Sequence, residues 1–112
     1  MKLIRPLAIT FSHGQRRLLH CLSFNARSLK NKLPELHEVL YNSTILYDIV
    51  CICESWLNNT VTNSMLEPKN IYTVYRIDRP DRSGGGVCVL VLQELNSIEV
   101  DILSAYPAIE CI

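Results

Sequence analysis

Two short apolar runs constrain this chain more than any other feature of its sequence. Residues 18–24 are mostly apolar and lead to Asn25, and residues 49–53 are apolar throughout between Asp48 and Glu54. Runs that are apolar on both faces are typical of central strands in a covered sheet. The sequence therefore predicts two buried strands at these positions.

The segment between the two runs has the period of an amphipathic helix. Apolar side chains recur at helical spacing from Leu29 to Leu40, with lysines and glutamates between them. Because Pro34 fits only in the first turn, the helix should begin near Asn31 and end at residues 42–43. A strand, a helix and a strand in this order predict a parallel, right-handed crossover unit.

The rest of the chain predicts further strands joined by turns. We expect strands at residues 72–76, 86–92 and 98–102, the last of them half-buried, and another apolar run begins at residue 108. Residues 1–17 show no clear period, so we interpret them as a loose or foreign leader before a domain of residues 18–112. A chain that ends inside an apolar run suggests a truncated domain.

Composition limits the class of protein but leaves its partner open. A chain of 112 residues with 48% hydrophobic residues suits one small globular domain or part of a larger one. Eleven basic residues balance eleven acidic ones, although residues 27–32 and 76–82 are locally basic and could face phosphates. The start of the chain is too short and broken for a signal peptide, and no apolar run reaches membrane-spanning length. We therefore expect an intracellular protein, in the cytoplasm or nucleus, with no membrane partner.

The five cysteines lie mostly inside apolar runs, which favours reduced, packed thiols over a disulfide framework. Cys51 and Cys53 could be read as half of a zinc site. No second pair of Cys or His stands at the spacing of a zinc finger, so we expect core packing and no zinc.

The crossover unit predicts that Asn25 and Glu54 lie together. Both residues stand at the carboxyl ends of parallel strands, which are about 4.8 Å apart when they are neighbours. An amide and a carboxylate there would suit a hard cation such as Mg²⁺. The pattern alone also allows a turn-forming Asn and a solvated Glu at the start of a loop.

Several strings in order resemble the endonuclease domain that opens the polyprotein of non-LTR retrotransposons. They are FNARSL at residues 24–29, YDIVCICESWL at 47–57, YR at 75–76 and DRSGGGV at 81–87, and the resemblance covers about residues 18–104. It implies an α+β fold, the four-layer sandwich of the endonuclease/exonuclease/phosphatase (DNase I-like) superfamily, with roughly the N-terminal half present. It also implies an enzyme that uses Mg²⁺, or Mn²⁺, to hydrolyse phosphodiesters and nick target DNA.

The resemblance implies catalytic roles for Asn25, which matches the active-site asparagine, and for Glu54, which matches the metal-binding glutamate. The family also needs an Asp with a neighbouring Asn, a further Asp and a late Ser-Asp-His string, all downstream of residue 102. None of the three histidines here matches the catalytic one. We therefore expect this chain to be inactive alone. The alternative is a non-catalytic relic of a mobile element that acts as a weak binding or self-associating module.

Four basic residues could contact the DNA backbone: Arg27, Lys30, Arg79 and Arg82. A solvated helix start or loop explains them as well. Residues 84–86, all glycine, predict a tight entry into a strand, and Trp56 is expected to pack as a lid on the strand ends. Half of a sandwich would leave an unpaired sheet edge and an uncovered apolar face, which predicts self-association.

Overall fold

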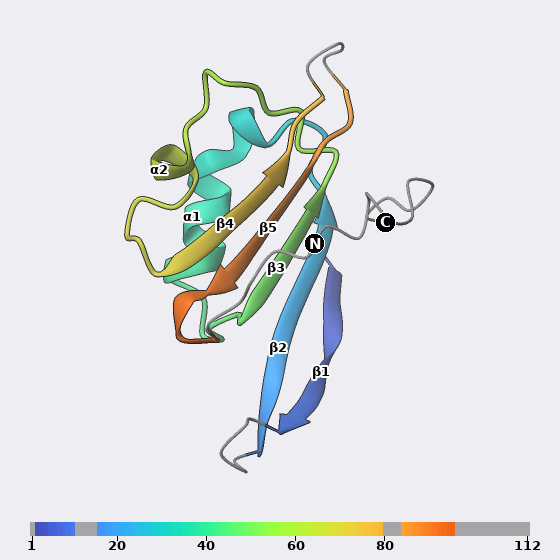
Figure 1. The fold of residues 1–112 in the computed structure, drawn as a ribbon, viewed down its shortest axis with the longest axis vertical. Helices are drawn as coiled ribbons and strands as arrows, with labels where there is room; N and C mark the ends of the chain where they lie inside the picture. The colour runs from blue at the N-terminus through green and yellow to red at the C-terminus, as the bar shows by residue number, and fades with distance from the viewer. Residues whose placement is uncertain (1, 11–15, 80–83, 96–112) are drawn as a thin grey trace.

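The centre of the molecule is a five-stranded mixed sheet (Figure 1). The computed structural model describes residues 2–10, 16–79 and 84–95. The strands are β1 (Lys2–Thr10), β2 (Arg16–Asn25), β3 (Ile49–Cys53), β4 (Tyr72–Ile77) and β5 (Val87–Leu92), in the spatial order β1-β2-β3-β5-β4. β2 and β3 run parallel, and the other neighbouring pairs run antiparallel. The predicted α+β class is confirmed at this level.

The predicted crossover unit is present. β2 is followed by a 3-10 turn, η1 (Leu29–Lys32), and by helix α1 (Leu33–Tyr41), and β3 returns parallel to β2. Pro34 lies at the start of α1, as its missing N–H requires. The helix ends at Asn42, whose backbone N–H donates to the carbonyl of Glu38. The parallel strand pair and the position of the helix between them were therefore readable from the apolar pattern.

Residues 2–10 are part of the sheet, which the leader prediction did not anticipate. β1 pairs antiparallel with β2, and the pairing shifts between Ile4 and Leu7. Pro6 lies at this irregularity, where a missing N–H costs no ladder hydrogen bond. Edge pairing uses backbone groups, so it needs no alternating pattern in the sequence. Whether this segment is foreign to the domain stays an open prediction.

One face of the sheet packs against the helices and forms the core. Alternate residues of β3 and β5 are fully buried there, because successive side chains of a strand point to opposite faces. Leu36 and Leu40 of α1 and Leu66 of the next helix belong to the same cluster. The core residues of the sheet are Leu22, Val50, Ile52, Tyr72, Cys88, Leu90 and Leu92.

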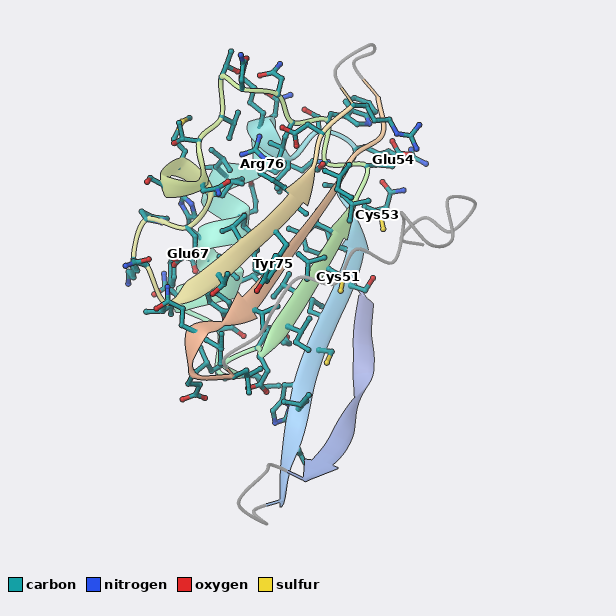
Figure 2. All side chains as sticks on the ribbon, in the orientation of Figure 1. Cys51, Cys53, Glu54, Glu67, Tyr75 and Arg76 are labelled. Atoms are coloured by element: carbon teal, nitrogen blue, oxygen red, sulfur yellow. The ribbon has the colours of Figure 1, made fainter. Side chains whose placement is uncertain are left out.

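The opposite face of the sheet is less covered. Ile49, Cys51, Cys53 and Val89 are half-buried, each next to a fully buried neighbour on its strand. All four described cysteines are free thiols. Cys88 is buried in the core; Cys21, which pairs with Ile49 and so lies on the less covered face, is also buried, whereas Cys51 and Cys53 on that face are half-buried. Figure 2 labels Cys51 and Cys53 along β3. The expectation of packed thiols therefore holds for the two buried ones, and Cys111 lies outside the described residues.

A short helix lies in the connection between β3 and β4. α2 (Asn63–Leu66) begins at Thr62, whose side chain accepts the N–H of Met65 at 3.2 Å. A single turn is too short to show a helical period. A 3-10 turn, η2 (Gln93–Leu95), follows β5.

The strands expected at residues 98–102 and after residue 108 lie outside the described part of the chain. Among the residues that the structure describes, no helix has the length and apolar character that a membrane crossing requires.

Candidate functional site

The loops that follow β2 and β3 continue side by side beyond the strands. Backbone N–H groups of Ala26, Ser28 and Leu29 donate to the carbonyls of residues 53, 54 and 55, at 2.9, 3.1 and 2.9 Å. Asn25 pairs with Cys53 at the last position of the parallel register. Asn25 and Glu54 therefore stand at the carboxyl ends of neighbouring parallel strands, as the crossover predicts, and Figure 2 shows Glu54 at this end.

The backbone around Glu54 is held in an unusual conformation. Glu54 and Trp56 both have a φ of 53°, in the left-handed region, which costs an L-residue roughly 1–2 kcal/mol each. The loop before β5 holds this turn: the N–H of Ser55 donates to Gly86 at 3.3 Å, and that of Trp56 donates to Gly85 at 2.9 Å. Such strain persists only where the surroundings enforce it, and it is concentrated at functional sites.

The glycine loop is shaped to fit against this turn. Gly85 and Gly86 have φ values of 81° and 87°. A Cβ atom on Gly86 would lie 2.8 Å from the hydroxyl oxygen of Ser55 and 3.3 Å from the carbonyl oxygen of Ile77. A side chain at position 86 would therefore push the loop away from Ser55. The predicted tight entry into the strand is confirmed.

One oxygen of the Glu54 carboxylate is held by two donors. Oε2 accepts the indole N–H of Trp56 at 2.7 Å and the backbone N–H of Gly85 at 3.1 Å. Oε1 accepts no hydrogen bond from the residues that the structure describes. The hydrogen bond from Trp56 is the largest cause that lowers the pKa of Glu54, followed by that from Gly85 and by the charges of Arg79 and Arg27. These groups together favour the ionised form of the Glu54 carboxylate.

The basic residues predicted to contact DNA are not equally placed. Arg27 is exposed, and both it and Arg79 are close enough to act on the charge of Glu54. The side chain of Arg79 lies against Gly85, since a Cβ there would be 2.6 Å from Arg79 Cδ. Lys30 is exposed in η1, with no described contact to the site. Arg82 lies outside the described residues.

The sequence did not single out Lys32, which stabilises the turn beside the site. Its ammonium group donates to the carbonyl of Ala26 and, at 3.4 Å, to that of Arg27. Nor did the sequence connect Trp56 with Glu54. Trp56 is 40% exposed, so it does not pack as a lid over the strand ends. Its indole instead donates a hydrogen bond to Glu54. The only sequence signal for this hydrogen bond was that Trp56 lies two residues after Glu54. That spacing brings the indole to the carboxylate because both residues have left-handed backbone conformations.

The donor set fits a hydrated divalent cation held through one protein oxygen. Across the described ranges, no three His, Cys, Asp or Glu side chains gather as a metal-binding group. Mg²⁺ needs fewer protein ligands, since it keeps several waters and binds through one or two carboxylates and substrate phosphates. Oε1 of Glu54 could serve as such a ligand, and Asn25 stands at the carboxyl end of the neighbouring strand.

The two histidines that the structure describes lie away from this edge. The backbone N–H of His20 donates to Asp48, which precedes β3, at 2.8 Å. The ring of His37 bonds the carbonyls of Met65 and Leu66 at 3.0 and 3.1 Å, linking α1 to α2.

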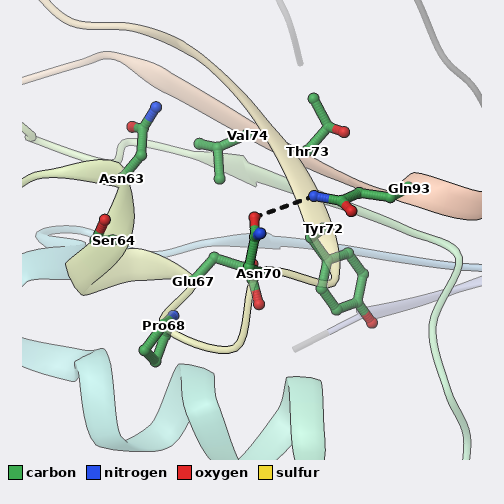
Figure 3. Close-up of a pocket in the computed structure, with 9 residues that line it drawn as sticks. All are labelled: Asn63, Ser64, Glu67, Pro68, Asn70, Tyr72, Thr73, Val74 and Gln93. Carbon is green, nitrogen blue, oxygen red and sulfur yellow. Dashed lines mark hydrogen bonds between the residues drawn. The ribbon is translucent and has the colours of Figure 1, made fainter.

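A cavity lies at the opposite end of the sheet (Figure 3). Its volume is about 370 Å³, and it is lined by polar residues of α2 and the start of β4, with Gln93 donating to Asn70 at 3.2 Å. Glu67 in its wall is 5% exposed and accepts the hydroxyl of Tyr41. No predicted site residue lines this cavity. A smaller hollow of about 240 Å³ adjoins Asn25, between Phe24 and Leu36.

No protein-family model matches the chain, and no curated protein or solved structure matches it either. The structure therefore describes the protein as an α+β domain with a mixed sheet. An ionised carboxylate stands at the carboxyl ends of its two parallel strands.

Proposed function

We propose that this chain carries the cation-binding opening of a Mg²⁺-dependent DNA endonuclease. The observation that carries the proposal is that Asn25 and Glu54 stand at the carboxyl ends of neighbouring parallel strands, with Arg27 and Arg79 near enough to act on the charge of the carboxylate. A carboxylate suits a hard cation, and guanidinium groups suit a phosphate. The resemblance of several ordered strings to retrotransposon endonucleases favours DNA as the phosphodiester substrate.

The chemistry would be hydrolysis of a phosphodiester by in-line attack of a water. A bound Mg²⁺ or Mn²⁺ supplies Lewis acidity toward a phosphate oxygen. Glu54 would hold the cation through Oε1, and Asn25 would orient the phosphate. Arg27 and Arg79 would neutralise negative charge next to the scissile group, with Lys30 and Arg82 as more distant backbone contacts.

We expect the chain to be inactive by itself. Attack by water needs a general base within hydrogen-bond reach. Within the described ranges, neither His20 nor His37 lies near Glu54. The proposal therefore assigns binding of the cation and positioning of the phosphate to this segment, and proton transfer to other residues of an intact domain.

The proposed fold is the N-terminal half of the endonuclease/exonuclease/phosphatase sandwich. The helix-covered sheet with a half-buried opposite face supports it, because a second sheet would pack on that face. In an isolated chain the same face and the sheet edges would favour self-association. The alternative, a relic that only binds or self-associates, shares this fold and differs in lacking a functional cation site.

Binding of Mn²⁺ separates these two proposals. Titration of the chain followed by electron paramagnetic resonance should show weak Mn²⁺ binding that Glu54→Gln abolishes. Glu38→Gln, which removes an exposed carboxylate of α1, is the matched control and should leave binding unchanged. Binding that survives Glu54→Gln would leave the relic as the better description.

Plasmid nicking tests the expectation of inactivity. The chain with Mg²⁺ or Mn²⁺ should leave supercoiled plasmid intact. Nicking that is lost in Glu54→Ala would show that the segment is a complete catalyst, so that the endonuclease assignment stands and the inactive part of the proposal is wrong.

A further inference from the structure

Glu54 offers its two oxygens unequally. Oε2 already accepts two hydrogen bonds, from the indole of Trp56 at 2.7 Å and from the backbone of Gly85 at 3.1 Å. The two donors belong to segments that are joined to each other, because the backbone N–H of Trp56 donates to the carbonyl of Gly85 at 2.9 Å. A cation that took both oxygens would have to displace these donors.

Divalent cations differ in how they use a carboxylate. Mg²⁺ and Mn²⁺ take octahedral sets of oxygens, and Mg²⁺ keeps several of its waters, so one carboxylate oxygen is enough. Ca²⁺ is larger, takes 6–8 oxygens and often binds a carboxylate through both of them. A carboxylate with one oxygen already occupied therefore favours the smaller cation.

We propose that Trp56 is a positioning residue that makes Glu54 a one-oxygen ligand and thereby selects Mg²⁺ and Mn²⁺ over Ca²⁺. The inference rests on the proposed function for its cation site and adds the residue that sets cation preference. Trp56 is suited to this role rather than to core packing. Its indole is 40% exposed, its backbone is in the left-handed region, and its polar edge faces the carboxylate.

The indole proton gives a direct measurement on the unmodified protein. The chain has a single tryptophan, so its nuclear magnetic resonance spectrum has a single indole N–H signal. This proton should exchange slowly with water, and it should stay protected at saturating Mg²⁺, because the cation takes Oε1. Faster exchange on Mg²⁺ binding would overturn the proposal, since it would mean that both oxygens are taken.

The variant Trp56→Phe keeps an aromatic ring and removes the N–H donor. Affinities for Mg²⁺ and Ca²⁺ are measured by competition against Mn²⁺. The preference for Mg²⁺ over Ca²⁺ should fall by about three- to tenfold, as expected for the loss of one solvent-exposed hydrogen bond of ordinary net strength. Gly85 still donates to Oε2, so the preference should not vanish. Tyr47→Phe, a change at the opposite end of β3, is the control and should leave the ratio unchanged.

The outcomes separate the two proposals. If Glu54→Gln leaves Mn²⁺ binding intact, the cation site itself is wrong. If Glu54→Gln abolishes binding but Trp56→Phe weakens Mg²⁺ and Ca²⁺ equally, the site stands and the selective role of Trp56 is wrong. Circular dichroism checks that the variant is folded; if it is not, the exchange of the indole proton in the unmodified chain decides.

Discussion

The two faces of strand β3 carry similar residues in different surroundings. Val50 and Ile52 are fully buried under the helices, whereas Ile49, Cys51 and Cys53 on the other face are half-buried. The continuous apolar run predicted cover on both faces. In the part of the chain that the structure describes, only one face of β3 is fully buried. Apolar residues along a strand therefore show which faces can be buried, but they do not show which faces are buried in this chain.

The largest expected difference between the two faces is in stability. Ile52→Ala should reduce the free energy of unfolding by about 2–5 kcal/mol, the usual cost of a cavity at a closed core position. Ile49→Ala makes the same change on the other face of β3 and should cost less, below about 1.5 kcal/mol, because its side chain is already partly in water. Urea unfolding of the two variants measures this. Equal costs would mean that the second face is covered in solution, for example by another copy of the chain.

A smaller effect is expected from a polar pair on the covered side. Tyr41→Phe removes the hydroxyl that donates to Glu67, a carboxylate that is 5% exposed. Leaving such a group without its donor should cost about 1–3 kcal/mol in urea unfolding. Ser23→Ala on the other face is the comparison and should change stability by less than about 0.5 kcal/mol. A negligible cost for Tyr41→Phe would show that water reaches Glu67, and that the covered side is less closed than its apolar residues suggest.

The smallest expected difference between the two faces is in the reactivity of their cysteines. Burial raises the pKa of Cys88, on the covered face, to about 12. Burial also raises the pKa of Cys51, but this thiol is half-buried on the other face. Because the thiolate is the reactive form and must meet the reagent, Cys51 should be alkylated in the native protein and Cys88 only after unfolding. Mass spectrometry of peptides after timed labelling measures this. Labelling of Cys88 at the rate of Cys51 would contradict the burial assigned to the helix-covered face.

The crossover was predictable because each of its parts leaves a local signal. The apolar runs mark β2 and β3, and Pro34 with the leucine spacing marks the start and the face of α1. β1 left no such signal, since an edge strand pairs through backbone groups that every residue carries. α2 is a single turn, too short for periodicity to register.

The candidate site was predictable in part for the same reason. Asn25 and Glu54 follow two apolar strands, and the rule that parallel strands end at one edge brings them together. By itself the sequence determined this pair, together with the basic residues nearby. It did not distinguish Arg27 and Arg79, which lie near Glu54, from Lys30, which is exposed in η1.

Only the tertiary structure decided how Glu54 is held. The donor Gly85 is 31 positions away in the chain, and it reaches the carboxylate because β5 pairs antiparallel with β3. The left-handed turn from Glu54 to Trp56 then aims the indole at the same oxygen. Local patterns predict which residues reach a strand end, whereas the direction of a hydrogen bond depends on neighbouring strands that no local pattern specifies.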